Sequence, residues 1–224
     1  MADTLLKLLG GLPLTLQLAA GSLLGGAVLA LGLTLLRGTG RVGGWVADLY
    51  VFVFRGSPLL VQIFLIYYGL GQVPALRHSL LWPLLREPYG CAMLALMLND
   101  AAYTSEILRG GLRAVPRGAV EAARVCGMSR PLALRRIVLP LAIRQALPAY
   151  GNEMISMTKS TALASVITLM EVTGIARAVI AETFRAVEVF LCAAAIYLAL
   201  TFVLAQLVGL LERSLSPAGQ GLAR

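Results

Sequence analysis

Long apolar stretches without a charged residue recur along this chain and predict helices that cross a membrane. Residues 8–36 contain no charge, and a helix over the strongly apolar positions 14–36 would be about 34 Å long. This length exceeds that of a bilayer core, which is roughly 30 Å thick. A cleaved signal peptide is the alternative, but its apolar region would cover only about 7–15 residues. We therefore expect a retained spanning helix here.

Four further segments have a suitable length for a spanning helix. Two of them are uncharged throughout, whereas the other two contain polar and charged residues between their apolar positions. The sequence thus predicts an all-α integral membrane protein, with residues 1–224 forming a single transmembrane domain. The five expected spans cover about 14–36, 56–76, 88–108, 145–170 and 189–211. A shorter apolar segment, 44–54, fits either an interfacial helix or the start of the second span.

The composition excludes a soluble globular protein. Apolar residues make up 58% of the 224 positions and charged residues 13%, whereas soluble domains carry about 25% charged residues. The single histidine, His78, and the widely separated Cys91, Cys126 and Cys192 supply neither a Cys/His metal site nor a disulfide framework. Serine–histidine catalysis would depend on His78 alone. We therefore expect no metal site and no enzymatic activity.

The charged residues are biased towards arginine and towards one side of the predicted membrane. The net charge is +8, and 17 of the 19 cations are arginine. The segments 37–55 and 109–144 and the C-terminal tail hold three, eight and two cations, whereas the opposite side holds five and Lys159 lies within a span. This asymmetry is the positive-inside pattern of membrane proteins. It predicts an external N-terminus and a cytoplasmic C-terminus, and it explains the basic excess without a nucleic-acid partner.

The predicted cytoplasmic segment 109–144 is too long for a simple connection between two helices. Residues 119–126 predict a short helix with Glu121 in its first turn, near the positive end of the helix dipole. Gly127 provides a break, and residues 132–137 predict a second short helix. Two small helices joined by a glycine would form a knob that protrudes into the cytoplasm, where a soluble partner could bind it.

The sequence of this segment resembles a known motif. Residues 121–140, EAARVCGMSRPLALRRIVLP, are similar to the EAA loop of permease subunits of bacterial ABC importers, with the spacing of that family throughout. FRGSPLLVQ at 54–62, AYTSEI at 102–107 and KSTAL at 159–163 resemble the polar-amino-acid subgroup of these permeases. The resemblance covers residues 50–188 with few gaps. Its C-terminal part looks closest to the histidine, lysine/arginine/ornithine and opine permeases.

This resemblance implies the fold of a type I ABC importer permease, located in the bacterial inner membrane. A coupling helix in the knob would dock onto a dimer of separate ATPase subunits, which would bind ATP and Mg²⁺. A solute-binding protein would deliver the substrate from outside, and a second permease, homologous but non-identical, would complete the pathway. The ATPase contact would involve Glu121, Ala122, Ala123, Gly127, Ile137 and Pro140.

The pattern of a phosphate-binding P-loop does not occur in this chain. Such a loop needs a lysine that follows glycine and precedes serine or threonine. The two lysines, Lys7 and Lys159, follow Leu6 and Thr158. We therefore expect ATP hydrolysis in the partner ATPase and no cofactor bound by this chain.

Polar side chains within the predicted third and fourth spans indicate a substrate pathway, because polar groups at membrane depth are costly and usually functional. We predict that Lys159 and the two hydroxyls after it bind a substrate carboxylate. Glu153 and Asn99, together with Asp100, would bind an ammonium group or a side chain, which favours a cationic amino acid. The candidate pathway residues are Asn99, Asp100, Tyr103, Asn152, Glu153, Lys159, Ser160 and Thr161.

Alternatives remain open for several of these residues. Glu106 and the arginine three positions later have the spacing of a structural ion pair, and Asn99 also fits an interhelical hydrogen bond. A different class of function is an ion-coupled secondary transporter that uses Asp100, Glu153 and Lys159 as a relay. Five spans without a visible internal repeat do not suit that class.

Proline and aromatic residues mark two further features. Pro140, Pro148 and Gly151 predict an irregular or kinked start of the fourth span. The outer segment 71–87 is a candidate docking surface for a solute-binding protein. Trp82 within it fits an interfacial aromatic anchor equally well.

Overall fold

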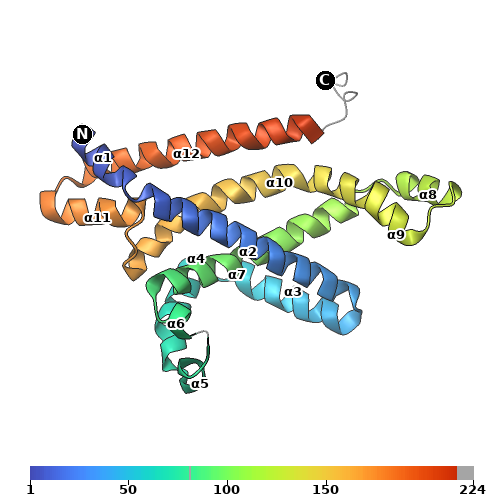
Figure 1. Cartoon of the computed structure of the whole chain (residues 1–224), viewed down its shortest axis with the longest axis horizontal. Helices are drawn as coiled ribbons and strands as arrows, with labels where there is room; N and C mark the ends of the chain where they lie inside the picture. Colours follow the sequence, from blue (N-terminus) through green and yellow to red (C-terminus); the bar gives the residue numbers. More distant parts are fainter. Residues whose placement is uncertain (81, 216–224) are drawn as a thin grey trace.

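A computed structural model describes residues 1–80 and 82–215, and all regular structure in this part of the chain is helical. The predicted all-α fold is therefore confirmed for the described residues. Four long helices, α2, α7, α10 and α12, dominate the arrangement (Figure 1). In chain order the elements are α1 (Ala2–Leu9), α2 (Leu12–Gly38), α3 (Arg41–Gly56), α4 (Leu59–Phe64), η1 (Leu65–Gly69), η2 (Leu70–Gln72), α5 (Pro74–Arg77), α6 (Trp82–Leu85), α7 (Pro88–Arg113), α8 (Arg117–Val125), α9 (Arg130–Ala133), η3 (Leu134–Val138), α10 (Leu139–Ser160), η4 (Thr161–Ile167), α11 (Val172–Thr183) and α12 (Ala186–Leu215).

Helices α2 and α7 pack closely because glycines on α2 face larger side chains on α7. A Cβ added to Gly25 would lie 2.9 Å from Met97 Sδ. A Cβ added to Gly26 would lie 2.8 Å from Asp100 Cγ, so only glycine admits this approach. Small residues at such positions are typical of helix contacts within membranes. Helix α10 also packs against α7, and α12 lies along α10 (Figure 1).

The predicted second span is broken in the structure. Helix α3, which contains the apolar segment 44–54, packs against α2, and the helical stretch from α4 to Gln72 leaves α3 at an angle of 103° (Figure 1). Pro58 causes the break, because it has no N–H and disfavours a helical conformation at the residue before it. Ser57 is accordingly extended, with a ψ of 146°.

Several helical stretches have the length and composition of a membrane span. In the described residues there are two such helices, or up to four spans if each bent pair of helices counts as one. These are the helices 3–38 and 186–214, and the pairs 41–56 with 59–72 and 130–167 with 172–183. Helix α7 is not among them, because Asn99 and Asp100 lie in the middle of its apolar sequence.

The predicted two-helix knob is present. Helix α8 covers the first predicted short helix, α9 and the π-helical turn η3 cover the second, and Gly127 between them is left-handed with a φ of 73°. The prediction that Glu121 lies in the first turn is wrong. Helix α8 begins at Arg117, directly after the extended Pro116, which has a ψ of 128°.

The helix that holds most of the fourth predicted span begins before the residues predicted for that span. Helix α10 begins at Leu139, with Pro140 in its first turn and Pro148 inside it, and the π-helical turn η3 precedes it. The predicted irregular start is thus confirmed. After Ser160 the chain tightens into the 3₁₀ segment η4, and α11 then diverges by 47°.

Candidate functional site

A polar cavity of about 420 Å³ lies where the break between α3 and α4 meets α7 and α10. It combines one arginine, one glutamate and several hydroxyl and amide groups, so it offers partners to both ends of a zwitterion. The lining residues are Arg55, Gly56, Ser57, Pro58, Leu59, Asn99, Tyr103, Glu153, Ser156, Met157 and Ser160.

Two amide side chains stabilise the broken backbone at this cavity. In an unbroken helix the carbonyl of Phe54 would accept from the N–H at position 58, which Pro58 lacks. Gln62 Nε2 donates to this carbonyl at 2.8 Å, and Asn99 Nδ2 approaches it at 3.3 Å. Gln62 also donates to the carbonyl of Ser57 at 3.1 Å and accepts from Asn99 at 3.0 Å. Asn99 therefore makes the interhelical hydrogen bonds that the sequence left as an alternative, while it also lines the cavity.

The two charged groups of the cavity come from different helices. Arg55 lies at the end of α3, with its guanidinium 4.9 Å from the ring centroid of Tyr103 on α7. This is a cation–π distance. Glu153 comes from α10 and is partly buried. Neither charge makes a hydrogen bond or ion pair with residues 1–80 or 82–215, so both are available to a ligand.

Sequence reasoning missed Arg55. It counted this arginine as one of the cations of a cytoplasmic loop, 37–55, whereas the structure places most of that segment in the helix α3. A possible indication was the position of Arg55 directly before the Gly-Ser-Pro sequence that breaks the helix.

The cavity brings together half of the predicted pathway residues: Asn99, Tyr103, Glu153 and Ser160. The other four lie elsewhere. Asp100 is fully buried against α2, where its Oδ2 accepts from Thr104 at 3.2 Å, and Thr161 is fully buried and donates to the carbonyl of Thr158 at 2.7 Å. Asn152 and Lys159 are exposed on α10 and do not line the cavity.

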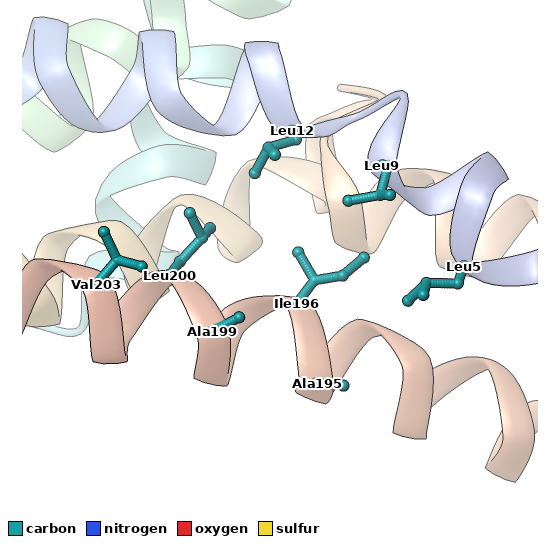
Figure 2. A pocket seen from close by; sticks show the side chains of 8 residues that line it. All are labelled: Leu5, Leu9, Leu12, Ala195, Ile196, Ala199, Leu200 and Val203. Carbon is teal, nitrogen blue, oxygen red and sulfur yellow. The ribbon is translucent and has the colours of Figure 1, made fainter.

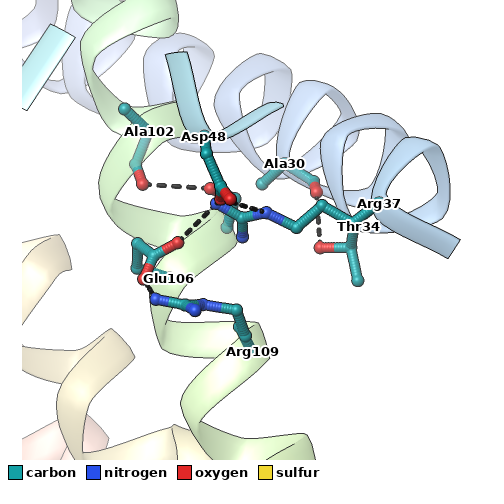
Figure 3. Close-up of polar contacts among 8 residues, drawn as sticks. Ala30, Thr34, Arg37, Asp48, Ala102, Glu106 and Arg109 are labelled. Carbon is teal, nitrogen blue, oxygen red and sulfur yellow. Dashed lines mark hydrogen bonds and ion pairs between the residues drawn. The ribbon is translucent and has the colours of Figure 1, made fainter. Parts of the chain in front are cut away.

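A second group of charges lies apart from the cavity, at the end of α2 (Figure 3). We call Arg37, Asp48, Glu106 and Arg109 the charge cluster. Arg37 Nη2 lies 2.8 Å from Asp48 Oδ1 on α3 and 2.6 Å from Glu106 Oε1 on α7. Glu106 also pairs with Arg109, as its i,i+3 spacing predicts.

A buried carboxylate that the sequence did not single out closes the junction before α11. Glu171 is fully buried and caps this helix, accepting from the backbone N–H groups of Thr173 at 3.0 Å and Gly174 at 2.7 Å. Tyr197 on α12 donates to the same carboxylate at 2.7 Å. The sequence Glu-Val-Thr-Gly was the available indication, since acidic residues favour helix N-caps.

The apolar pocket between α1 and α12 has a different chemistry (Figure 2). Its volume is about 370 Å³. Its lining residues are all aliphatic: Leu5, Leu9, Leu12, Ala195, Ile196, Ala199, Leu200 and Val203. Such a lining offers no hydrogen bond to a charged solute, so the polar cavity is the better candidate for binding one.

The knob contains a groove of about 470 Å³ between α8 and the start of α10. Four residues of the predicted ATPase contact line it: Ala122, Ala123, Ile137 and Pro140. Glu121 is exposed on α8, outside the lining, and Gly127 forms the turn. The groove is thus built from residues 119–144, on both sides of the glycine.

Comparison with known proteins identifies the family. Residues 17–217 match the binding-protein-dependent transport system inner membrane components. The chain belongs to this family. The permease is 59% identical to the octopine transport system permease protein OccM of Rhizobium meliloti, over 96% of this chain and 88% of the relative. It is 54% identical to the nopaline transport system permease protein NocM of Agrobacterium fabrum, over 94% and 88%. It is 45% identical to the arginine ABC transporter permease protein ArtM of Escherichia coli, over 75% and 76%.

Solved structures agree with this assignment. A chain of an amino acid ABC transporter crystallised with histidines matches at a TM-score of 0.84 and 35% identity, with 96% of each chain covered. The inward-facing MetNI methionine ABC transporter shares the fold at a TM-score of 0.74 and 16% identity, over 97% of this chain and 100% of the other. The predicted ABC importer permease, a transport component rather than an enzyme, is confirmed. The comparisons do not support the ion-coupled secondary transporter.

Proposed function

We propose that this permease carries polar, basic amino acids or opines across the bacterial inner membrane by alternating access. The class of substrate is supported by the relatives named for octopine, nopaline and arginine transport. It is also supported by the polar cavity, which is the observation that carries the proposal. One cation and one anion without a partner among residues 1–80 and 82–215 share this cavity, as recognition of a zwitterion requires.

In this proposal Arg55 binds the substrate carboxylate and Glu153 binds its ammonium group or a cationic side chain. The guanidinium of Arg55 is planar and suits a carboxylate, and the ring of Tyr103 holds it in one orientation. Ser57 and Ser160 add hydroxyl groups to the same cavity. Arg55 thereby takes the carboxylate-binding role that the sequence assigned to Lys159.

The remaining predicted residues have supporting roles in the proposed pathway. Asp100 and Thr161 are fully buried and do not line the cavity; Asp100 would support the packing of α7 on α2, and Thr161 the start of η4. Asn152 and Lys159 are exposed on α10 and would face the part of the pathway that a second permease completes. We expect this second permease to be homologous and non-identical.

We propose five membrane spans within a single transmembrane domain, residues 1–224, with the N-terminus outside and the C-terminus in the cytoplasm. The distribution of the cations supports this orientation. Helix α7 would be the third of these spans despite its polar centre, because α2 and α10 pack against it. On the outer side, the segment 71–87 would contact a solute-binding protein.

The cytoplasmic knob would couple this permease to a dimer of ATPase subunits that bind ATP and Mg²⁺. The groove supports this role, because four of the six residues of the predicted ATPase contact line it. The coupling residues in this proposal are Glu121, Ala122, Ala123, Gly127, Ile137 and Pro140. Binding of a loaded solute receptor outside and of ATP inside would then drive alternating access.

The proposal is tested by Glu153→Gln in the complete transporter reconstituted in proteoliposomes. ATP-driven uptake is measured for arginine and for citrulline, which has nearly the same shape without the positive charge. We expect arginine uptake to fall about tenfold or more relative to citrulline, because the variant removes the charged partner of the guanidinium. Glu188→Gln, in an exposed ion pair at the start of α12, is the matched control.

Equal losses for arginine and citrulline would refute the role of Glu153 in charge selection. Unchanged uptake of both solutes would remove the cavity from the pathway altogether.

A further inference from the structure

The charge cluster joins three helices at the end of α2. The same nitrogen of Arg37, Nη2, contacts both Asp48 on α3 and Glu106 on α7 (Figure 3). The side chains of Arg37 and Glu106 are 14% and 16% exposed, so water and salt screen their attraction only partly. Asp48 is 66% exposed, and its contact is correspondingly weaker.

Helix α3 depends on such contacts because little of it is buried. Only Gly43, Ala47 and Val51 are buried, and two of these have almost no side chain to pack. The large apolar residues of α3 instead lie on the surface of the chain: Val42, Trp45, Val46, Leu49, Phe52 and Val53. Away from the bend at Pro58, its polar ties to the neighbouring helices include the Arg37–Asp48 contact and a 2.7 Å hydrogen bond from Tyr50 to the carbonyl of Leu98 on α7.

The two helices that Arg37 connects also meet in the polar cavity. Arg55 lies seven residues after Asp48 on α3, about 10 Å along the helix, and Tyr103 lies less than one turn before Glu106 on α7. The charge cluster and the Arg55–Tyr103 contact therefore join α3 to α7 at two points, in addition to the hydrogen bonds that Leu98 and Asn99 make with α3. A shift of α3 at the first point would move Arg55 at the second.

We infer that Arg37 is a positioning residue for the polar cavity. By binding Asp48 and Glu106 it fixes α3 against α7, and so it sets where Arg55 and Ser57 lie relative to Glu153. An effect of Arg37 on transport rests on the proposed function of the cavity. Its effect on the position of Arg55 and Ser57 does not depend on that function.

The experiment measures the geometry first, without substrate. Ser57→Cys provides a thiol in the cavity, in a chain whose exposed Cys126 is replaced by serine and whose other two cysteines are buried. The rate of reaction with a charged methanethiosulfonate reagent is measured in the assembled transporter in nanodiscs. We expect Arg37→Gln to raise this rate about fivefold or more, since loosening α3 exposes the cavity.

Two further variants separate positioning from a merely structural role. Arg37→Lys should leave the reaction rate close to that of the parent, because one ammonium group can contact both carboxylates as Nη2 does. Asp48→Asn should raise the rate about twofold, because it removes only the exposed contact. If the transporter with Arg37→Gln does not assemble, the thiol reaction rate of Asp48→Asn decides the test. Glu188→Gln again serves as the control.

Transport is then measured with the same variants and the native Ser57. Arg37→Gln should raise the KM for arginine about tenfold while Arg37→Lys restores it, since a displaced Arg55 binds the carboxylate poorly. An unchanged thiol reaction rate in Arg37→Gln or, failing assembly, in Asp48→Asn would overturn the inference, whatever transport does. A changed rate combined with normal uptake by Glu153→Gln would uphold the positioning of α3 and reject the cavity as the substrate site.

Discussion

Two breaks between consecutive helical stretches of the permease can be compared. The first lies at Pro58, between α3 and α4, and the second lies at Glu171, before α11. At the second break every polar group of the capping residue is used: Glu171 binds two backbone N–H groups and the hydroxyl of Tyr197. The backbone around Gly11 also packs directly against this break, because a Cβ on Gly11 would lie 2.6 Å from the backbone of Glu171. This break is a sealed joint between α1, α11 and α12.

At the break at Pro58, side chains also bind the backbone, but the neighbouring charged groups are left available. Gln62 and Asn99 bind the carbonyl of Phe54, which the proline leaves without its helical donor, and Gln62 also binds the carbonyl of Ser57. The charged groups beside it, Arg55 and Glu153, keep their binding capacity and line a cavity. An interrupted helix is therefore structural where its polar groups are all paired. It becomes a candidate binding site where some of them remain available.

The sealed joint should be the more sensitive of the two to loss of its polar group. Glu171→Ala would leave the backbone N–H groups of Thr173 and Gly174 without their acceptor and would remove the 2.7 Å partner of the Tyr197 hydroxyl. We expect a loss of about 2–4 kcal/mol in the free energy of unfolding. The thermal unfolding midpoint of the purified transporter measures this effect. Glu182→Ala, an exposed glutamate on the same helix, is the control and should change the midpoint little. A similar midpoint for both variants would show that the joint contributes no more than surface residues do.

The break at Pro58 should respond more weakly in stability and more strongly in transport. Gln62→Leu removes three hydrogen bonds to the bend, while Asn99 remains near the Phe54 carbonyl. We expect a loss of about 1–2 kcal/mol in stability. Uptake should fall about tenfold, because the bend carries Ser57 and follows Arg55. Gln206→Leu, at an exposed position on α12, should affect neither quantity. Loss of stability without loss of uptake would make this break a structural joint like the first.

The knob could be predicted from sequence because its determinants are local. Within one continuous segment, Pro116 and Gly127 bound the first short helix, and the second follows Gly127. The error concerned only the start of α8, which placed Glu121 in the wrong turn. Helix ends depend on backbone conformation at one or two residues, which composition does not specify.

The cavity could be predicted only in part because its residues come from four helices. Glu153, Asn99 and Tyr103 stand out as polar residues within apolar spans. The helical period shows which residues share a face but not which face is inside, so the exposed Lys159 was grouped with them. Arg55 was missed because the 103° bend, and not hydropathy, brings the end of α3 into the cavity.

The smallest expected effect is that of a substitution at Arg55. It tests whether this residue serves binding, unlike Glu171, whose polar groups are all paired within the fold. Arg55→Lys keeps the charge but loses the planar group that lies over Tyr103. We expect unchanged thermal stability and a KM for arginine raised about threefold, since the cation–π contact is worth about 0.5–1 kcal/mol at an exposed site. Arg41→Lys, an exposed position at the start of the same helix, is the control and should leave the KM unchanged. An equal KM for both variants would mean that the charge alone matters at position 55. A fall in stability would instead mean that Arg55 serves the fold, as Glu171 does at the sealed joint.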